Sequence, residues 1–189
     1  AKILLAEALE DNLDDKVKDQ RFNRWHTCSL CEQQYHGVVI CALGWACWKT
    51  YLGRPERDQT RNMAMSLLGT GLSEVGHYED ALCVQTAELS VLQRHGAWET
   101  SILTTQGNLA ITYGKLGQFE QALSIEKDVY FGHLKLYGEE NATTLLGANN
   151  YATSLFDLRR FDEVRGLLLK VMPVARRVLG ASHEQTLKM

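Results

Sequence analysis

The chain has 189 residues, 45% of them hydrophobic and 23% charged, with only two prolines, a composition typical of an ordinary globular protein and not of a disordered or collagen-like one. Twenty Lys and Arg against 23 Asp and Glu leave a formal charge of -3, so no basic footprint for nucleic acid or an acidic membrane is present. The longest nearly apolar stretch, Gly37 to Cys47, is about half as long as a bilayer span requires. We therefore expect no nucleic-acid binding and no membrane insertion.

Residues 1–20 open the chain with acidic side chains and one early apolar run, Ile3 to Ala6. This pattern predicts a short amphipathic helix that caps the fold or belongs to an incomplete repeat. The chain as a whole carries five cysteines, an odd number, which favours a reducing compartment over a disulfide-stapled secreted scaffold. We expect a cytoplasmic or other reducing intracellular location.

Residues 21–57 form a Cys-rich segment in which Cys28, Cys31, His36 and Cys41 follow the spacing of a zinc knuckle. Thiolates and an imidazole at this spacing can close a tetrahedron around one zinc ion. The pattern departs from a zinc knuckle in one place, because Tyr35 precedes the histidine where knuckles carry glycine. Zinc is the one cofactor that the sequence suggests, bound by a small N-terminal module.

A competing interpretation of the same segment comes from helical spacing. Apolar residues from Val38 to Tyr51 recur on one side of a helix that runs up to Gly53, where the second helix of a degenerate repeat is expected. On such a helix Cys41 and Cys47 are small, partly buried hydrophobic side chains with free thiols. Zinc would then need Cys41 to coordinate from the first turns of the helix, with His26 as a substitute ligand, and both interpretations remain open.

Residues 58–189 contain an internal repeat. Gly96, Gly138 and Gly180 are spaced by 42, and apolar residues inside each period recur at helical spacing, which predicts two helices per repeat. The expected antiparallel pairs are 59–75 with 78–95, 99–116 with 119–137, and 141–158 with 161–179. Gly76, Gly117 and the pair Arg159–Arg160 lie at the turn inside each pair, where glycine can take the positive φ of a helix C-cap.

These hairpins predict an all-α fold, an α-α superhelix, because one hairpin cannot bury both of its apolar stripes and must stack on its neighbours. Three repeats are expected, followed by the start of a fourth near Met189, so we expect the chain to be a fragment of a longer array. Gly107, Gly114 and Gly147 fall inside first helices, where glycine is unfavourable. Tight helix packing is the favoured reason, and a close-approaching partner is the alternative. Cys83 is expected in or near the core.

The second repeat carries a family signature: Asn108-Leu109-Ala110, Tyr113, Leu116-Gly117, Phe119-Glu120 and Ala122-Leu123. It resembles a tetratricopeptide repeat, and the 42-residue period resembles the long-helix repeats of kinesin light chains. The stretch Cys28 to Glu56 also resembles the segment that precedes tetratricopeptide arrays in uncharacterised proteins of unicellular algae, a resemblance that implies no activity. No coiled-coil heptads connect the chain to a motor subunit.

The kinesin-light-chain resemblance implies that the inner faces of the first helices bind an extended peptide, whose backbone is held by asparagine side chains. Asn108 and Asn150 match that position, Asn149 matches the preceding asparagine, and Thr153 joins them as a candidate partner-binding residue. Amides suit this role because they donate and accept hydrogen bonds. The competing interpretation is that these side chains hydrogen-bond within the fold or only face solvent.

No nucleophile motif, phosphate loop or metalloprotease helix is present, so no catalytic residue is expected. Two non-enzymatic functions remain: a scaffold that binds a peptide or partner protein on the concave face of the repeats, and a permanent subunit of a larger assembly. Apolar side chains at predicted solvent positions, namely Trp98, Phe131 and Phe156, would favour the second.

Overall fold

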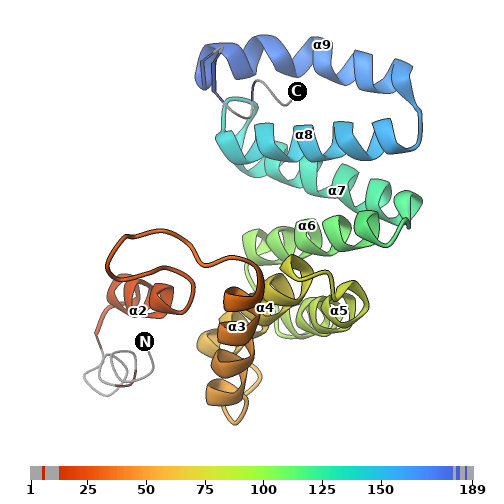
Figure 1. Ribbon diagram of the computed structural model, residues 1–189. Helices are drawn as coiled ribbons and strands as arrows, with labels where there is room; N and C mark the ends of the chain where they lie inside the picture. The colour runs from red at the N-terminus through yellow and green to blue at the C-terminus, as the bar shows by residue number, and fades with distance from the viewer. Residues whose placement is uncertain (1–5, 7–12, 181, 184–185, 187–189) are drawn as a thin grey trace. The chain divides into compact units, whose positions relative to one another are not determined.

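The computed structural model describes residues 6, 13–180, 182–183 and 186 (Figure 1). The described part is all-α and divides into two compact units, residues 1–95 and 96–189. None of its helices is long and apolar enough to cross a membrane. The capping helix expected in residues 1–20 lies mostly outside the described residues.

The helices follow the repeat pattern closely. The first unit contains α2 (Asp15–Phe22), the 3₁₀ helix η1 (Asn23–Trp25), α3 (Gly37–Tyr51), α4 (Gln59–Glu74) and α5 (Tyr78–Arg94); the second contains α6 (Glu99–Lys115), α7 (Phe119–Tyr137), α8 (Ala142–Asp157) and α9 (Phe161–Val178). The six helices of the three predicted pairs begin and end within a residue of the expected positions.

Side-chain caps explain where several helices begin. Asp58 accepts a hydrogen bond from the backbone N–H of Arg61 at 3.1 Å at the start of α4, and Asn141 accepts one from Thr143 at 2.8 Å at the start of α8. Each cap satisfies a backbone donor that the first turn of a helix leaves without an intrahelical partner.

The turns inside the three helix pairs share one hydrogen-bond pattern. The backbone N–H groups of His77, Gln118 and Arg160 donate to the carbonyl groups of Leu72, Tyr113 and Leu155, at 2.9 to 3.0 Å. The residue before each donor has a positive φ, and it is Gly76 in the first pair and Gly117 in the second. The third pair places Arg159 there, at φ 56, in a conformation that disfavours side chains with a Cβ.

In the first unit, α3 and α4 approach each other unusually closely. A methyl group at Gly71 would lie 2.8 Å from the Cα of Cys41 and 2.9 Å from the carbonyl oxygen of Ile40, and one at Gly44 would lie 3.0 Å from the Cα of Leu68. Backbone therefore packs against backbone at this crossing, and both glycines are required by the contact.

Aromatic side chains attach the Cys-rich segment to this helix pair. Phe22 and Trp25, buried to 2% and 8% exposure, join a core cluster that includes Ile40, Cys47 and Tyr51 of α3. Burial raises the pKa of the Cys47 thiol to about 12. The expectation that Cys47 is a buried free thiol on a helix is confirmed, whereas Cys83, expected near the core, is exposed on α5.

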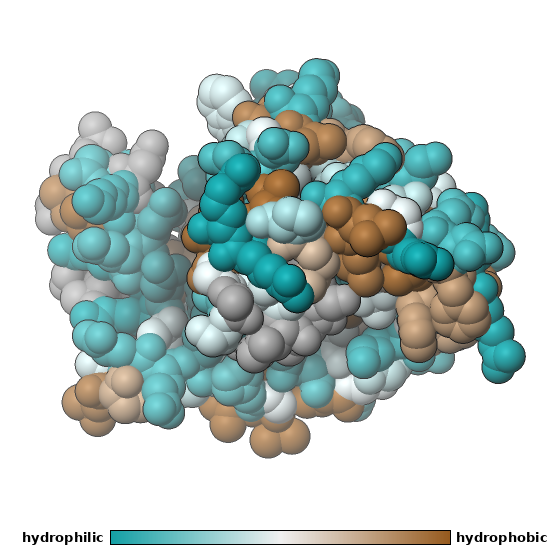
Figure 2. All heavy atoms as spheres, turned by 90° about the horizontal axis from the view of Figure 1, so that it is seen from above, coloured by the Kyte–Doolittle hydropathy of each residue, from teal (hydrophilic) through white to brown (hydrophobic). Residues whose placement is uncertain are grey.

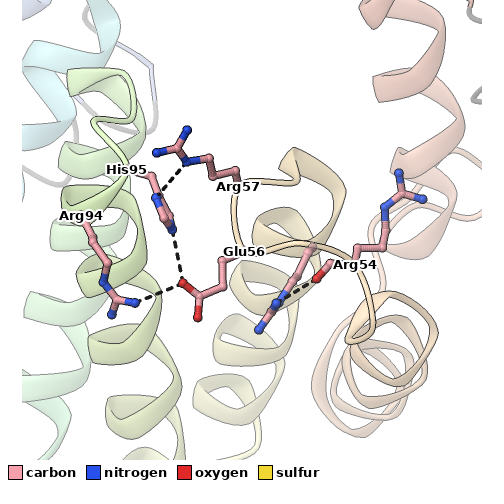
Figure 3. Close-up of polar contacts among 6 residues, drawn as sticks. Arg54, Glu56, Arg57, Arg94 and His95 are labelled. Carbon is pink, nitrogen blue, oxygen red and sulfur yellow. Dashed lines mark hydrogen bonds and ion pairs between the residues drawn. The ribbon is translucent and has the colours of Figure 1, made fainter.

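A polar network connects the loop between α3 and α4 to the end of α5 (Figure 3). The Glu56 carboxylate lies 3.1 Å from Arg94 and 3.2 Å from His95 Nε2, and the Arg57 guanidinium donates to His95 Nδ1 at 3.2 Å. The hydrogen bond from His95, together with Arg94, lowers the pKa of Glu56. The network holds the two ends of the α4–α5 hairpin together.

In the second unit, α7 packs between α6 and α8, and α9 packs on α8. The α8–α9 core contains Leu145, Ala148, Val171 and Ala175, each at most 6% exposed. The Thr144 hydroxyl donates to the His133 carbonyl at 3.2 Å and joins α8 to α7. Three helices, α6, α7 and α8, thereby enclose the concavity that forms the candidate site.

Candidate functional site

A groove of about 250 Å³ lies among α6, α7 and α8, all in the second unit. Its walls come from α6, through Ala110, Ile111, Gly114 and Lys115, and from α8, through Asn150, Thr153, Ser154 and Asp157. Its floor comes from α7, through Ala122 and Glu126. We call this cavity the α6–α8 groove.

Glu126 is the unusual residue of the groove. Its side chain is 2% exposed, and no hydrogen-bond donor of the described residues reaches its Oε2 atom. Burial raises the pKa of this carboxyl group to about 8, because the charged form loses its hydration. At neutral pH the free protein therefore holds Glu126 mainly as a neutral acid at the floor of the groove.

The α8 wall presents oxygen atoms to the groove. The Thr153 hydroxyl donates to the Asn149 carbonyl at 3.0 Å, which uses its proton and leaves its lone pairs free to accept. The exposed Asp157 carboxylate lies one helical turn further along. Asn150, which is half-buried in the same wall, offers an amide that both donates and accepts.

Two of the four predicted partner-binding residues, Asn150 and Thr153, line this groove. Asn108 on α6 and Asn149 on α8 are half-buried and are not part of its lining. Their backbone carbonyl groups accept the hydroxyl protons of Thr112 and Thr153, respectively. The structure thus brings together half of the predicted set, and the roles of all four in binding stay predictions.

The glycines of α6 do not have the role that the sequence favours. A methyl group at Gly107 or Gly114 would meet nothing within 4 Å, so tight packing does not explain either residue. At Gly147, by contrast, a methyl group would lie 3.4 Å from the Cα of Tyr130, and tight packing is confirmed. Gly114 leaves open space on the wall of the groove, which fits the alternative of a closely approaching partner.

The predicted metal ligands are only partly gathered. Cys28 and Cys31 share a tight turn, in which the Cys28 carbonyl accepts from the N–H of Glu32 at 3.0 Å. Hydrogen bonds to Cys28 from the backbone N–H groups of Cys31 and Leu30 and from the Cys31 side chain lower the Cys28 pKa to about 7. The two thiols therefore lie together at the tip of a small hairpin closed by the bridge between Thr27 and Gln34.

The other two predicted ligands lie elsewhere in the first unit. His36 is 71% exposed at the start of α3, with its Nδ1 atom 3.9 Å from Glu74 Oε2. Cys41 packs against the α4–α5 core cluster around Leu68. In the part of the chain that is described, no three His, Cys, Asp or Glu side chains are arranged to hold a metal ion. Zinc binding by the four residues stays a prediction from their spacing.

The apolar side chains that the sequence placed at solvent positions are exposed. Trp98 is 84% exposed, Phe131 50% and Phe156 60%. On the face of the molecule shown in Figure 2, brown apolar side chains interrupt the hydrophilic surface. Exposed apolar groups of this kind can contact another protein.

Sequence reasoning missed Glu126, although a signal for it exists. The apolar stripe of α7 runs through Ala122, Leu123 and Val129, and Glu126 occupies the helical position between them. A carboxyl group on a core-facing stripe is rare unless it has a function or a partner. The first repeat has Gln85 at the corresponding position, offset by 41, and it is also buried, at 2%.

The comparisons with known proteins identify the repeats of the second unit. The tetratricopeptide repeat family matches residues 102–142 and 144–185. These segments are two tetratricopeptide repeats, of a kind that generally serves as a protein–protein interaction module. No curated protein matches the chain, and no comparison supports the algal resemblance of the Cys-rich segment.

Solved structures share the fold. BtubC (BKLC) from P. vanneervenii has a TM-score of 0.63 and 16% identity, over 78% of this chain and 60% of that one. A Podosopora anserina protein assigned as a kinesin light chain, with nearly identical TPR-like repeats, has a TM-score of 0.64 and 16% identity. A single-substitution variant of that protein has 0.65 and 16%, and each covers 98% of this chain and 78% of that one. This chain thus spans less than two thirds of the first relative's length. The all-α fold of TPR-like helix pairs is confirmed.

Proposed function

We propose that this chain is a non-enzymatic interaction module that binds an extended segment of a partner protein in the α6–α8 groove. The observation that carries the proposal is the meeting of Asn150 and Thr153 in one groove on two tetratricopeptide repeats. An amide at this place can pair with both the N–H and the C=O of a peptide backbone, which suits sequence-tolerant capture of an extended chain.

The open space at Gly114 supports the same function. Because no side chain or backbone of the described residues lies within 4 Å of the missing Cβ, a peptide backbone can approach α6 closely there. Glycine costs roughly 1 kcal/mol of helix stability relative to alanine, and in this wall a bound segment would supply the compensating contact.

Selection of peptides on the full chain tests the proposal. A phage-displayed library of random peptides would be selected against the wild-type protein, and the affinity of a recovered peptide would be measured by fluorescence anisotropy. We expect Asn150→Ala to weaken that peptide by about tenfold, equivalent to one or two lost hydrogen bonds. A peptide that binds Asn150→Ala as tightly as wild type contradicts the groove.

Asn108→Ala and Asn149→Ala are matched variants, because both residues are half-buried asparagines on the same two helices and lie outside the groove lining. We expect smaller losses from them. Losses as large as that of Asn150→Ala would show that the peptide covers a wider surface, as the family resemblance implies. Circular dichroism of each variant checks that the helices are unchanged.

A permanent subunit of a larger assembly is the second candidate function, favoured by the exposure of Trp98, Phe131 and Phe156. Analytical ultracentrifugation separates the two functions. A chain that stays monomeric and binds a selected peptide in a one-to-one ratio supports the interaction module. A chain that self-associates until these three residues are changed to serine supports the subunit.

A further inference from the structure

We propose that the α6–α8 groove takes the ammonium group of a lysine side chain from the bound segment, with Glu126 as its counter-charge. The inference deepens the proposed function and rests on it, since the lysine belongs to the peptide that the groove holds. It names the chemistry of one side chain of the partner, which the fold by itself leaves open.

The balance of hydrogen-bonding groups points to a donor-rich ligand. Glu126 brings a carboxyl group whose Oε2 atom has no hydrogen-bond partner among the described residues. Asp157 brings a second carboxylate, and the Thr153 hydroxyl has already given its proton to the Asn149 carbonyl. Oxygen acceptors therefore predominate, and a lysine ammonium group carries three donors and no acceptor.

The shape of the groove fits a long, narrow side chain. Ala110, Ile111, Gly114 and Ala122 provide apolar wall and floor beside the carboxyl group of Glu126. A lysine stem of four methylene groups can lie along such a wall while its charged end reaches a polar group. A peptide backbone is too wide to reach a floor residue that is only 2% exposed, whereas an extended side chain can.

The charges that face Glu126 come from both neighbouring helices. Lys115 of α6 and Asp157 of α8 line the same groove, and both side chains are exposed. Among the described residues that line the groove, Lys115 is the one cation, and it would compete with an incoming ammonium group for the carboxylates. Replacing Lys115 by alanine should therefore strengthen the binding of a lysine side chain.

The protonation state of Glu126 gives the binding a defined pH dependence. Burial raises the pKa of Glu126 to about 8, so an ammonium ligand must displace the proton at neutral pH. The ligand binds the ionised form more tightly, and its affinity should rise as the pH rises from 6 to 8, by on the order of tenfold or more. A ligand that uses the neutral acid as a hydrogen-bond donor would show the opposite trend.

A fragment titration tests this without knowledge of the partner. The probe is Nα-acetyl-lysine methylamide, added to the full 15N-labelled chain and followed by the amide signals of Ala110 and Gly114. We expect saturable shifts that disappear in Glu126→Gln, persist in the control Glu120→Gln, an exposed residue of the same helix, and disappear in Gly114→Leu, which fills the wall without meeting another atom within 4 Å of its Cβ.

Two further probes decide whether the ammonium group is responsible. Nα-acetyl-norleucine methylamide has a similar apolar stem without the charge and should cause no shifts. Nα-acetyl-arginine methylamide should bind more weakly than the lysine derivative. Shifts from norleucine, stronger binding of arginine, unchanged binding in Glu126→Gln, or weaker binding at pH 8 than at pH 6 would each overturn the inference.

The outcomes also separate this inference from the proposed function. If selected peptides need Asn150 but tolerate replacement of every lysine, the groove binds peptides and the lysine inference is wrong. If the selected peptides bind Asn150→Ala unchanged while the lysine derivative still requires Glu126, the site for lysine exists and the proposed function of the groove is wrong.

Discussion

The crossing of α3 with α4 and the groove among α6, α7 and α8 both contain glycines inside helices, yet the two places have opposite environments. At Gly44 and Gly71 a methyl group would meet backbone atoms of the facing helix at 3.0 Å or less. At Gly107 and Gly114 it would meet nothing within 4 Å. The same residue type therefore closes one contact and keeps the other place open.

The contrast extends to the polar groups nearby. The core around α3 and α4 is built from apolar and aromatic side chains, whereas the floor of the groove holds the carboxyl group of Glu126 without a partner for its Oε2 atom among the described residues. A protein rarely buries such a group without a reason. Open wall and buried acid together distinguish a site that receives a ligand from a contact that completes the fold.

The largest effect should come from removing the buried acid. The folded-state pKa of Glu126, about 8, lies above the ordinary value of 4.5 that applies to the unfolded chain. The unfolded chain thus loses this proton first as the pH rises, and the free energy of unfolding falls between the two values. Glu126→Gln should remove a loss of about 3 kcal/mol between roughly pH 5 and pH 7.5.

Chemical denaturation of the full chain at a series of pH values measures this effect, as the difference between wild type and variant. Glu120→Gln, an exposed residue of the same helix, is the control and should follow the wild-type profile. A Glu126→Gln profile parallel to that of the wild type would show that the carboxyl group ionises normally in the fold.

The closed contact should respond most strongly to a single methyl group. Gly71→Ala places a Cβ within 3.0 Å of backbone atoms of Ile40 and Cys41, which cannot move away as a flexible side chain can. We expect a loss of about 2 kcal/mol in the free energy of unfolding, because overpacking outweighs the gain in helix propensity. Urea denaturation measures it, and unchanged stability would mean that the two helices separate easily.

The open wall should respond in the opposite direction. Gly107→Ala and Gly114→Ala add a methyl group in free space, and each should raise the free energy of unfolding by about 0.5 to 1 kcal/mol through helix propensity. Differential scanning calorimetry of the two variants beside Gly71→Ala compares the two environments directly. A loss of stability in Gly114→Ala would contradict an open groove.

The smallest effect concerns a place where glycine is missing. Arg159 adopts φ 56 in the turn between α8 and α9, where the first two helix pairs have glycine. Arg159→Gly should relieve the strain of the left-handed conformation and stabilise the chain by roughly 0.5 kcal/mol, after the entropy of the unfolded chain is counted. The reverse test, Gly117→Ala at φ 74, should destabilise it by about 1 kcal/mol. Chemical denaturation of both variants measures the two changes, and a destabilised Arg159→Gly would mean that the arginine side chain contributes more than its backbone costs.

The sequence predicted the helices well because a 42-residue period places the same apolar spacing and the same turn in each copy. Even the turn at Arg159 follows the pattern, because the helices on both sides of it determine the backbone there. The environment of a single residue is a different matter. Whether Gly107 and Gly114 face a neighbour or a void, and whether Cys83 is inside or outside, depends on which helices lie opposite.

The candidate site shows the same division. Asn150 and Thr153 are recognisable by their place in the repeat, and the structure puts both in the groove. Glu126 breaks the apolar stripe of α7 and could have been noticed, but its lack of a partner for Oε2 within the described part of the chain follows from three helices meeting around it. The zinc spacing is local to the chain, whereas coordination requires side chains from a hairpin and a helix to converge.

The network around Glu56 fixes the proton of a single imidazole ring. His95 accepts from Arg57 through Nδ1 and lies 3.2 Å from Glu56 through Nε2, so only the tautomer with hydrogen on Nε2 satisfies both neighbours. Its ring nitrogens should therefore give two widely separated 15N resonances. That pair of signals is a built-in spectroscopic reporter of whether the loop after α3 remains fastened to the end of α5.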